Sequence, residues 1–348
     1  MRRPPVRLAC PDRRSLLTGA AALGLSATAV ACGSSEPATD ENGRIRLRLA
    51  VGQPSSAGLG GFYQALATGL YEARGLNVQM IRPGFGQDVP RALASGNAEL
   101  GLADDSFMPL RLVAEGAPVK AVAAFFQQSP QALIRHAPEA VNRAPASTGP
   151  IQVAEADRDT LWPWLQARLG YTDSQLADLD LEAFRADPRL TLLGHIAREA
   201  VELGESGAPP LDVRLLAEDG YASYGALILA PTAFARDNED ALRAFIAASI
   251  EGWADYIGGD PDPAHALIRR ANRDQSPSRL DGARAALREA GVVTGGGLAA
   301  GIGAMSVERW QAFFESAVEA GVAPADLDWR QAFTTDYLSP AVAAAPAA

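Results

Sequence analysis

The chain has 348 residues, of which 48% are hydrophobic, and this is enough for one large domain or for two lobes of ordinary size. It carries 31 basic and 41 acidic residues, so nucleic acid, whose phosphates need a positive surface, is not an expected partner. The single lysine, Lys120, does not end a glycine-rich loop, which excludes a P-loop nucleotide site.

The first 31 residues have the pattern of an export signal rather than of a folded segment. Five arginines precede an apolar run at 15–31 that is short for a membrane span. The sequence RRSLL at 13–17 resembles a twin-arginine export signal. The sequence AVAC at 29–32 resembles the box at which bacterial lipoproteins are cut and acylated, although Ala29 stands where that box usually has leucine. We therefore predict a signal peptide over 1–31 and a lipid anchor on Cys32, with an ordinary cleavable signal as the alternative.

Cleavage before Cys32 would leave a polar, flexible tether over residues 32–43. Cys10 and Cys32 are the only cysteines, so the folded part is expected to have neither a disulfide nor a thiol site. The leader holds five Arg and one Asp, which leaves 26 basic and 40 acidic residues and a formal charge of −14. The protein is thus predicted to be exported to the periplasm or the cell surface as a tethered lipoprotein.

Strand and helix patterns alternate from residue 44 to residue 136. Alternating polar and apolar residues predict a strand at 44–51, and helix spacing follows from Phe62 to Ala73. Asp88 is placed to cap a helix that runs to about Ser95. The other elements expected in this part are a helix at 106–116 and strands at 76–82, 98–103, 118–126 and 131–136.

A polar, proline-bearing segment at 138–150 is predicted to cross between two lobes. Beyond it the pattern predicts strands at 151–156, 212–218 and 224–230 and helices at 160–170 and 195–204. From Pro231 onward the pattern is mostly helical. Strands that alternate with helices predict an α/β fold with parallel sheets flanked by helices, and the C-terminal part is expected to be helical.

Few of the usual catalytic motifs are present. His136, His195 and His265 are far apart and lack ligand spacing, so no metal site is predicted. The chain has no G-x-S-x-G elbow, and the GFGQDV sequence at 84–89 lacks the third glycine of a dinucleotide fingerprint. No cofactor is expected.

The remaining candidates lie where strands end. In open parallel sheets, ligands bind beyond the carboxyl ends of the strands, near helix N-termini. Asp104 and Asp105 are adjacent, and on a strand only one of them could face a cleft. Amides, hydroxyls and aromatic rings suit a flat, polar small molecule. The candidates chosen on this argument are Gln53, Ser55, Ser56, Phe62, Tyr63, Asp105, Ser106, Phe107 and Gln127.

Four segments carry a family likeness: GGFYQALATGLYEARGLNV at 60–78, ALASGNAELGLADDS at 92–106, EGAPVKAVAAFFQQSP at 115–130, and more weakly YGALILAPTAF at 224–234. On these segments the chain resembles the periplasmic substrate-binding proteins of bacterial ABC importers. It is most similar to the group named for thiamine-pyrimidine synthesis and uptake, which also includes nitrate, sulfonate and taurine binders.

The resemblance implies a two-lobe, type II periplasmic-binding-protein-like fold that closes on its ligand. Residues 44–136 and 224–340 would form the first lobe, and 137–223 the second. The implied function is an extracytoplasmic receptor, working as a monomer, that delivers a small organic solute to a membrane permease. By position, Glu199 and Tyr224 fall where the family's second-lobe and hinge contacts lie.

Two departures from the family pattern bear on the ligand. Pyrimidine binders commonly carry an Asp-Trp pair after the first strand, where this chain has Gly52 and Gln53. A Leu-x-Gly-Lys segment that often opens the second lobe is also missing. A thiamine-precursor pyrimidine or similar heterocycle is the preferred ligand, and a nitrate, sulfonate or taurine type of ligand is the alternative.

Two further alternatives concern the kind of protein. A pyrimidine-forming enzyme of the same fold consumes a pyridoxal cofactor and its own histidine beside a cysteine-rich motif. This chain has no cysteine after residue 32 and carries an export signal, so it is predicted not to be an enzyme. A receptor that senses the ligand without importing it is equally compatible with the sequence.

Overall fold

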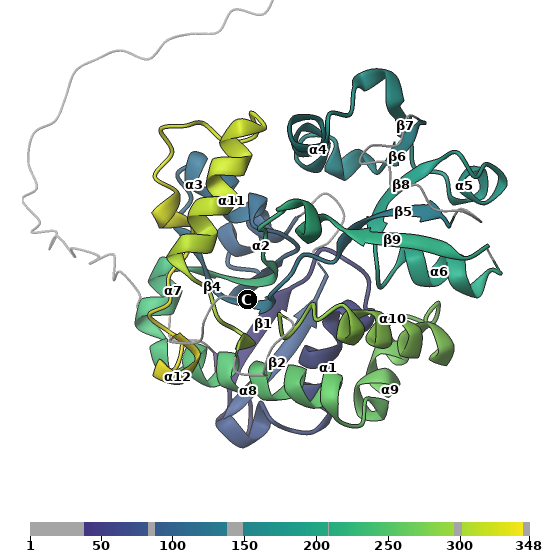
Figure 1. Ribbon diagram of the computed structural model, residues 1–348. Coiled ribbons are helices and arrows are strands. Elements are labelled where there is room, and N and C mark those ends of the chain that lie inside the picture. Colours follow the sequence, from purple (N-terminus) through teal and green to yellow (C-terminus); the bar gives the residue numbers. More distant parts are fainter. Residues whose placement is uncertain (1–37, 83–87, 138–148, 208, 296–300, 344–348) are drawn as a thin grey trace, which may run out of the picture. The chain divides into compact units, whose positions relative to one another are not determined.

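The computed structural model describes residues 38–82, 88–137, 149–207, 209–295 and 301–343, which all belong to one compact unit that starts at Ser35 (Figure 1). Its core is built on two five-stranded sheets. The first sheet has the order β2-β1-β3-β10-β4. Its strands are β1 (Ile45–Ala50), β2 (Leu76–Ile81), β3 (Leu100–Ala103), β4 (Val119–Phe126) and β10 (Gly225–Pro231).

The second sheet repeats this arrangement with the order β7-β6-β8-β5-β9. Its strands are β5 (Gln131–His136), β6 (Ile151–Val153), β7 (Leu176–Asp178), β8 (Thr191–His195) and β9 (Leu211–Leu215). In each sheet one strand runs against both of its neighbours: β10 in the first and β5 in the second. Both reversed strands follow directly on a strand of the other sheet, so the chain crosses between the sheets twice, at 127–130 and at 216–224.

The α/β architecture is confirmed, and three details differ from the sequence-based expectation. The sheets are mixed rather than parallel, because each admits one strand that arrives from the opposite direction. Strand β5, which the expected boundary at residue 136 groups with the first lobe, belongs to the second sheet. Strands β7 and β8 were not predicted, since β7 has three residues and β8 was not separated from the helix after it.

Helices cover both sheets (Figure 1). Those of the second sheet are α4 (Leu161–Leu169), α5 (Leu181–Ala186) and α6 (Glu199–Glu205). The others are α1 (Gly60–Ala67), α2 (Val89–Ala94), α3 (Phe107–Ala114), α7 (Thr232–Asp237), α8 (Glu239–Gly258), α9 (Asp262–Ala271), α10 (Pro277–Glu289), α11 (Val307–Glu319) and α12 (Pro340–Ala343). Short 3-10 helices span Ala57–Leu59, Glu72–Arg74, Glu155–Asp157, Asp173–Gln175, Leu216–Asp219 and Trp329–Ala332.

Helices α1 and α8 pack closely because glycines stand at their contact. A Cβ atom added to Gly252 would lie 2.7 Å from the Cβ of Ala65 and against the carbonyl oxygen of Gly61. The aromatic rings of Phe62, Phe125 and Trp253 fill the space beside this contact, with ring centroids 5.0 and 5.7 Å from Phe62. The family-like segment at 60–78 therefore packs in the hydrophobic core.

The described end of the expected tether is attached to the first sheet. Thr39 forms a bridge with Ile45, and the Asp40 carboxylate accepts hydrogen bonds from Arg44 and from the side chain of Asn77. Cys32, the signal peptide and the crossing at 138–148 lie outside the described residues. No helix within the described ranges combines the length and the apolar character that a membrane crossing needs.

Candidate functional site

A cleft of about 690 Å³ lies at the carboxyl ends of strands from both sheets. It is lined by Gln53 after β1, Asp104 and Asp105 after β3, Ala154, Ala156 and Asp157 after β6, and His195, Arg198 and Glu199 at and after β8. Phe107, Met108, Leu110 and Phe126 add apolar surface, and residues 322–324 and Leu327 close one side. This is where the strand-end rule places a ligand in an open sheet.

The end of β3 brings two carboxylates into the cleft together. The backbone bends directly after Ala103, so the alternation of a strand does not extend to Asp104 and Asp105. Both residues line the cleft, and the expectation that only one could do so was wrong.

Asp105 is held by the first turn of α3. Its Oδ1 accepts hydrogen bonds from the backbone N–H groups of Phe107 and Met108, at 3.0 and 3.3 Å. Burial, and then the neighbouring Asp104, raise the pKa of Asp105 to about 6 despite these two bonds.

Asp104 bonds to a neighbouring strand end of its own sheet. Its Oδ1 accepts a hydrogen bond of 3.0 Å from the side-chain amide of Gln53. Partial loss of water in the cleft raises the pKa of this carboxyl group, although the residue is exposed, while the positive charge of Arg198 acts in the other direction. Because Arg198 follows β8, this attraction joins groups from the two sheets.

Asp157 supplies a third acid from the second sheet. It ends the 3-10 helix after β6 and is partly buried. Loss of water raises its pKa to about 6; Arg198 opposes the shift, and Glu199 and Asp104 add to it. Two carboxyl groups of the cleft, Asp105 and Asp157, are therefore partly protonated near pH 6.

His195 and Glu199 form a fixed pair at the end of β8. Oε2 of Glu199 accepts a 2.7 Å hydrogen bond from the backbone N–H of His195. Nδ1 of His195 accepts a 3.0 Å bond from the N–H of Ala197, so the ring is neutral with its proton on Nε2. Burial, and then the charge of Arg198, hold the pKa of His195 well below its usual value.

Four of the predicted site residues line this cleft: Gln53, Asp105, Phe107 and Glu199. The others near the first strand do not. Ser55 and Tyr63 are each 8% exposed and hydrogen-bond to each other at 2.6 Å, and Phe62 packs in the core. Ser56 precedes the 3-10 helix at Ala57–Leu59 and is not part of the lining.

Ser106, Gln127 and Tyr224 lie at the crossings between the sheets instead. The N–H of Ser106 donates to the hydroxyl of Ser223, and the N–H of Tyr224 donates to the hydroxyl of Ser106, at 3.0 and 3.1 Å. The side chain of Gln127 donates to the carbonyl oxygens of Ala124 and Ala304. These residues connect the site loop after β3 to the second crossing and brace the first crossing.

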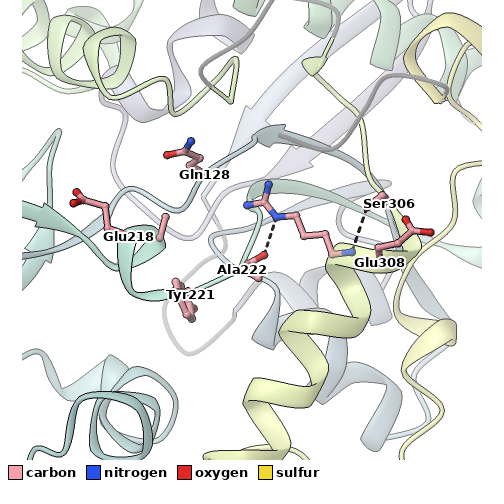
Figure 2. A pocket seen from close by; sticks show the side chains of 9 residues that line it. Gln128, Glu218, Tyr221, Ala222, Ser306 and Glu308 are labelled. Atoms are coloured by element: carbon pink, nitrogen blue, oxygen red, sulfur yellow. Dashed lines mark hydrogen bonds between the residues drawn. The ribbon is translucent and has the colours of Figure 1, made fainter.

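A second cavity, of about 540 Å³, lies beside the second crossing (Figure 2). Arg309 of α11 reaches across it, and its guanidinium donates to the carbonyl oxygens of Ala222 and Ser223 at 2.9 and 3.1 Å. The same group lies 4.2 Å from the ring centroid of Tyr224. Since Arg309 is engaged in holding the crossing, this cavity belongs to the crossing segment.

Sequence reasoning missed Asp104, Asp157, His195 and Arg198 as site residues. Asp157 directly follows the strand predicted at 151–156, but it was not selected. His195 and Arg198 were missed with β8, although the apolar run Leu192–Leu193 before Gly194 was a usable signal. No cluster of three or more metal-binding side chains occurs among the residues that the structure describes.

The raised pKa values give a testable pH dependence. A carboxyl group whose pKa is higher in the folded than in the unfolded chain binds a proton on folding, so its contribution to stability falls as pH rises from about 4 to about 6. We expect Asp105→Asn and Asp157→Asn to be more stable than the parent protein at pH 7 and to lose part of that advantage by pH 5.

Urea unfolding of each variant and the parent at both pH values measures this difference. Asp240→Asn is the control, because Asp240 is exposed at the start of α8, away from the cleft. An advantage that stays constant between pH 5 and pH 7 would show that these carboxyl groups are ionised in the folded state throughout.

Known proteins share the sequence pattern and the two-sheet fold described above. The family model described as NMT1/THI5 like matches residues 56–146, which contain three of the four segments that carry the likeness seen in the sequence. A solved periplasmic aliphatic sulphonate binding protein, SsuA from Escherichia coli, is 16% identical with a TM-score of 0.62, covering 83% of this chain and 92% of its own. The fold is that of the periplasmic binding proteins.

Other structures share the periplasmic-binding-protein fold. A protein from Bordetella bronchiseptica RB50 is 17% identical with a TM-score of 0.57, covering 84% of this chain and 95% of its own. The desulfurization enzyme DSZB is 11% identical with a TM-score of 0.54, covering 85% and 99%. A search of curated protein sequences gives no significant match. Because the fold occurs both in binding proteins and in an enzyme, it does not by itself distinguish capture from catalysis.

Proposed function

We propose that this protein is an extracytoplasmic receptor that captures a small organic solute in the cleft between its two sheets and presents it to an ABC permease. The observation that carries the proposal is a cleft of ligand size whose polar groups come from both sheets, while only two chain crossings connect those sheets. The family model and the binding proteins of the same fold support it.

In the proposed mechanism the first lobe carries the first sheet and the second lobe carries the second sheet. The boundaries stay as expected at 44–136, 137–223 and 224–340, except that β5 moves with the second lobe. Ligand held by Asp105 from one side and by Asp157 or His195 from the other would favour the closed arrangement. Ser106 would transmit the contact, because it directly follows Asp105 and bonds to Ser223 and Tyr224 of the second crossing.

The finer assignments are also proposals. A thiamine-precursor pyrimidine or similar heterocycle is the preferred cargo, and sulfonate, nitrate or taurine is the alternative. We also propose that the protein is attached to the membrane through Cys32 and works as a monomer. It would deliver its solute to a permease rather than signal its presence. The competing hypothesis is that the protein is an enzyme, and conversion of the bound solute to a product would establish it.

Ligand binding should stabilise residues 35–348 and make them more compact. A solute at 100 times its dissociation constant adds about 2.7 kcal/mol to the free energy of unfolding. Thermal-shift screening against pyrimidines, thiamine precursors, taurine, alkanesulfonates and nitrate, together with small-molecule extracts, identifies the solute. Small-angle scattering then measures a decrease in the radius of gyration.

Asp157→Asn should weaken binding of that solute, and the surface control Asp240→Asn should not. If the solute stabilises Asp157→Asn as much as the parent protein and leaves the radius of gyration constant, that result would mean that the solute binds outside the cleft. Failure of every pure compound and every extract to stabilise the protein would contradict a receptor role.

A further inference from the structure

The walls of the cleft carry an excess of negative side chains. Five of the lining residues are carboxylates, namely Asp104, Asp105, Asp157, Asp159 and Glu199. Two are arginines, Arg111 and Arg198. The guanidinium of Arg111 lies 3.8 Å from the carboxylate of Glu115 on the same helix, and that of Arg198 lies 3.7 Å from the carboxylate of Glu199. Each arginine therefore already has an acidic neighbour, and the excess of negative charge rests on the four aspartates.

The acids come from both sheets and act on one another. Asp104 raises the pKa of Asp105 beside it and also that of Asp157, which belongs to the other sheet. Asp157 in turn raises the pKa of Asp105. An empty cleft therefore resists closure through like-charge repulsion, and a positive charge placed among the three would remove that repulsion.

An independent feature of the cleft also points to a ligand. His195 is 8% exposed and lines the cleft, and its Nδ1 is occupied by the N–H of Ala197. Its Nε2–H has no hydrogen-bond partner within the described ranges. Nε2 is not one of the buried side-chain atoms that lack a partner, so it is accessible from the cleft and can donate to an acceptor on a ligand.

The rest of the lining is apolar. Phe107 and Phe126 are each about 5% exposed or less and form part of the cleft wall with Leu110 and Leu327. Such a surface suits a ring or a short hydrocarbon chain rather than a bare inorganic ion.

We propose that the solute captured in this cleft is a small organic cation, with an apolar ring or chain, a positive nitrogen group that lies among Asp104, Asp105 and Asp157, and an acceptor that meets Nε2 of His195. This inference rests on the proposed function for its biological meaning. It disfavours sulfonate, nitrate and other anions, which the three acids would repel.

The charge preference of the cleft can be measured without knowing the solute. Residues 35–348 contain no cysteine, so one can be introduced as Ala156→Cys, an exposed position within the cleft lining. Its rates of reaction with a cationic trimethylammonioethyl and an anionic sulfonatoethyl methanethiosulfonate are compared. Ala247→Cys, exposed on α8, gives the reference ratio for the acidic protein as a whole.

We expect the cation-to-anion rate ratio at position 156 to exceed that at position 247 on the order of tenfold, because clefts lined by one sign of charge concentrate the opposite ion. Adding Asp105→Asn and Asp157→Asn should bring the ratio close to the reference. A ratio less than about threefold above the reference, or one that the two substitutions leave unchanged, would overturn the inference.

Lowering the pH provides a second arm, since thiol ionisation affects both reagents equally. The ratio should fall between pH 7 and pH 5 as Asp105 and Asp157 take up protons. The other charged or titratable groups around them are Asp104, Arg111, Asp159, His195, Arg198, Glu199 and Tyr221.

The solute screen separates this inference from the proposed function. A cation that stabilises the protein and is weakened at least tenfold in affinity by Asp157→Asn supports both. An anion that binds in the cleft would overturn the charge assignment and leave the receptor intact. If the rate measurement shows a strong preference for the cation but no solute stabilises the protein, the charge assignment stands and the receptor function is contradicted.

Discussion

Replacing Gly252 with alanine is expected to lower the free energy of unfolding by about 1–3 kcal/mol or more, the usual cost of overfilling a packed core. The added methyl group would lie 2.9 Å from the backbone nitrogen of Ala65 as well as against the Gly61 carbonyl oxygen. These are main-chain atoms, so no change of rotamer relieves the overlap, and α1 must move away from α8.

Gly258→Ala provides the matched control for this experiment. Gly258 is the last residue of the same helix, and a Cβ atom there would have no neighbour within 4 Å. Alanine is the better helix former by roughly 1 kcal/mol, so this variant should be equal to or more stable than the parent protein. Urea denaturation of both variants gives the comparison, and equal stabilities would show that α1 and α8 separate without cost.

The second large effect is expected for Arg309→Met. The substitution keeps an unbranched side chain that reaches as far as the arginine Nε. It removes two charged hydrogen bonds to the carbonyl oxygens of Ala222 and Ser223 and the contact with the Tyr224 ring. Each charged hydrogen bond contributes about 1.5–3 kcal/mol where it is buried, and Arg309 is half-buried, so we expect a loss of about 2–3 kcal/mol.

Arg330→Met isolates the part of this loss that comes from the aromatic contact. Arg330 is exposed and lies 4.4 Å from the ring centroid of Trp329, so its substitution should cost well under 1 kcal/mol. Arg309→Met should also weaken solute binding, because a loosened crossing favours the open arrangement, whereas Arg330→Met should not. Similar losses in the two variants would contradict the role of Arg309 as a brace of the hinge.

The sequence predicted the parts of the fold that depend on local chemistry. Asp88 was expected to cap a helix, and its side chain does accept a 2.9 Å bond from the N–H of Arg91 at the start of α2. Gln53 and Asp105, which were selected because they follow predicted strands, line the cleft, and their role in ligand binding stays a prediction. Local patterns succeed here because a cap or a strand end is determined by a few neighbouring residues.

The misses have long-range causes. Ser106 was taken for a ligand contact, but its hydroxyl is occupied by Tyr224, which is far away in sequence. The polarity of a side chain shows that it needs a partner and does not show whether that partner is a ligand or the protein. In the same way, the position of β5 in the second sheet depends on its pairing with β8 and β9, which follow it in the chain.

The exchange of one strand between the sheets has a consequence for the order of folding during synthesis. All five strands of the second sheet have left the ribosome once Leu215 has emerged, whereas the first sheet must wait for β10, which ends at Pro231. Until then β3 and β4, whose place between them β10 will fill, have exposed edges that can pair with other chains. The second sheet can thus form first and hold the nascent chain until β10 pairs with β3 and β4.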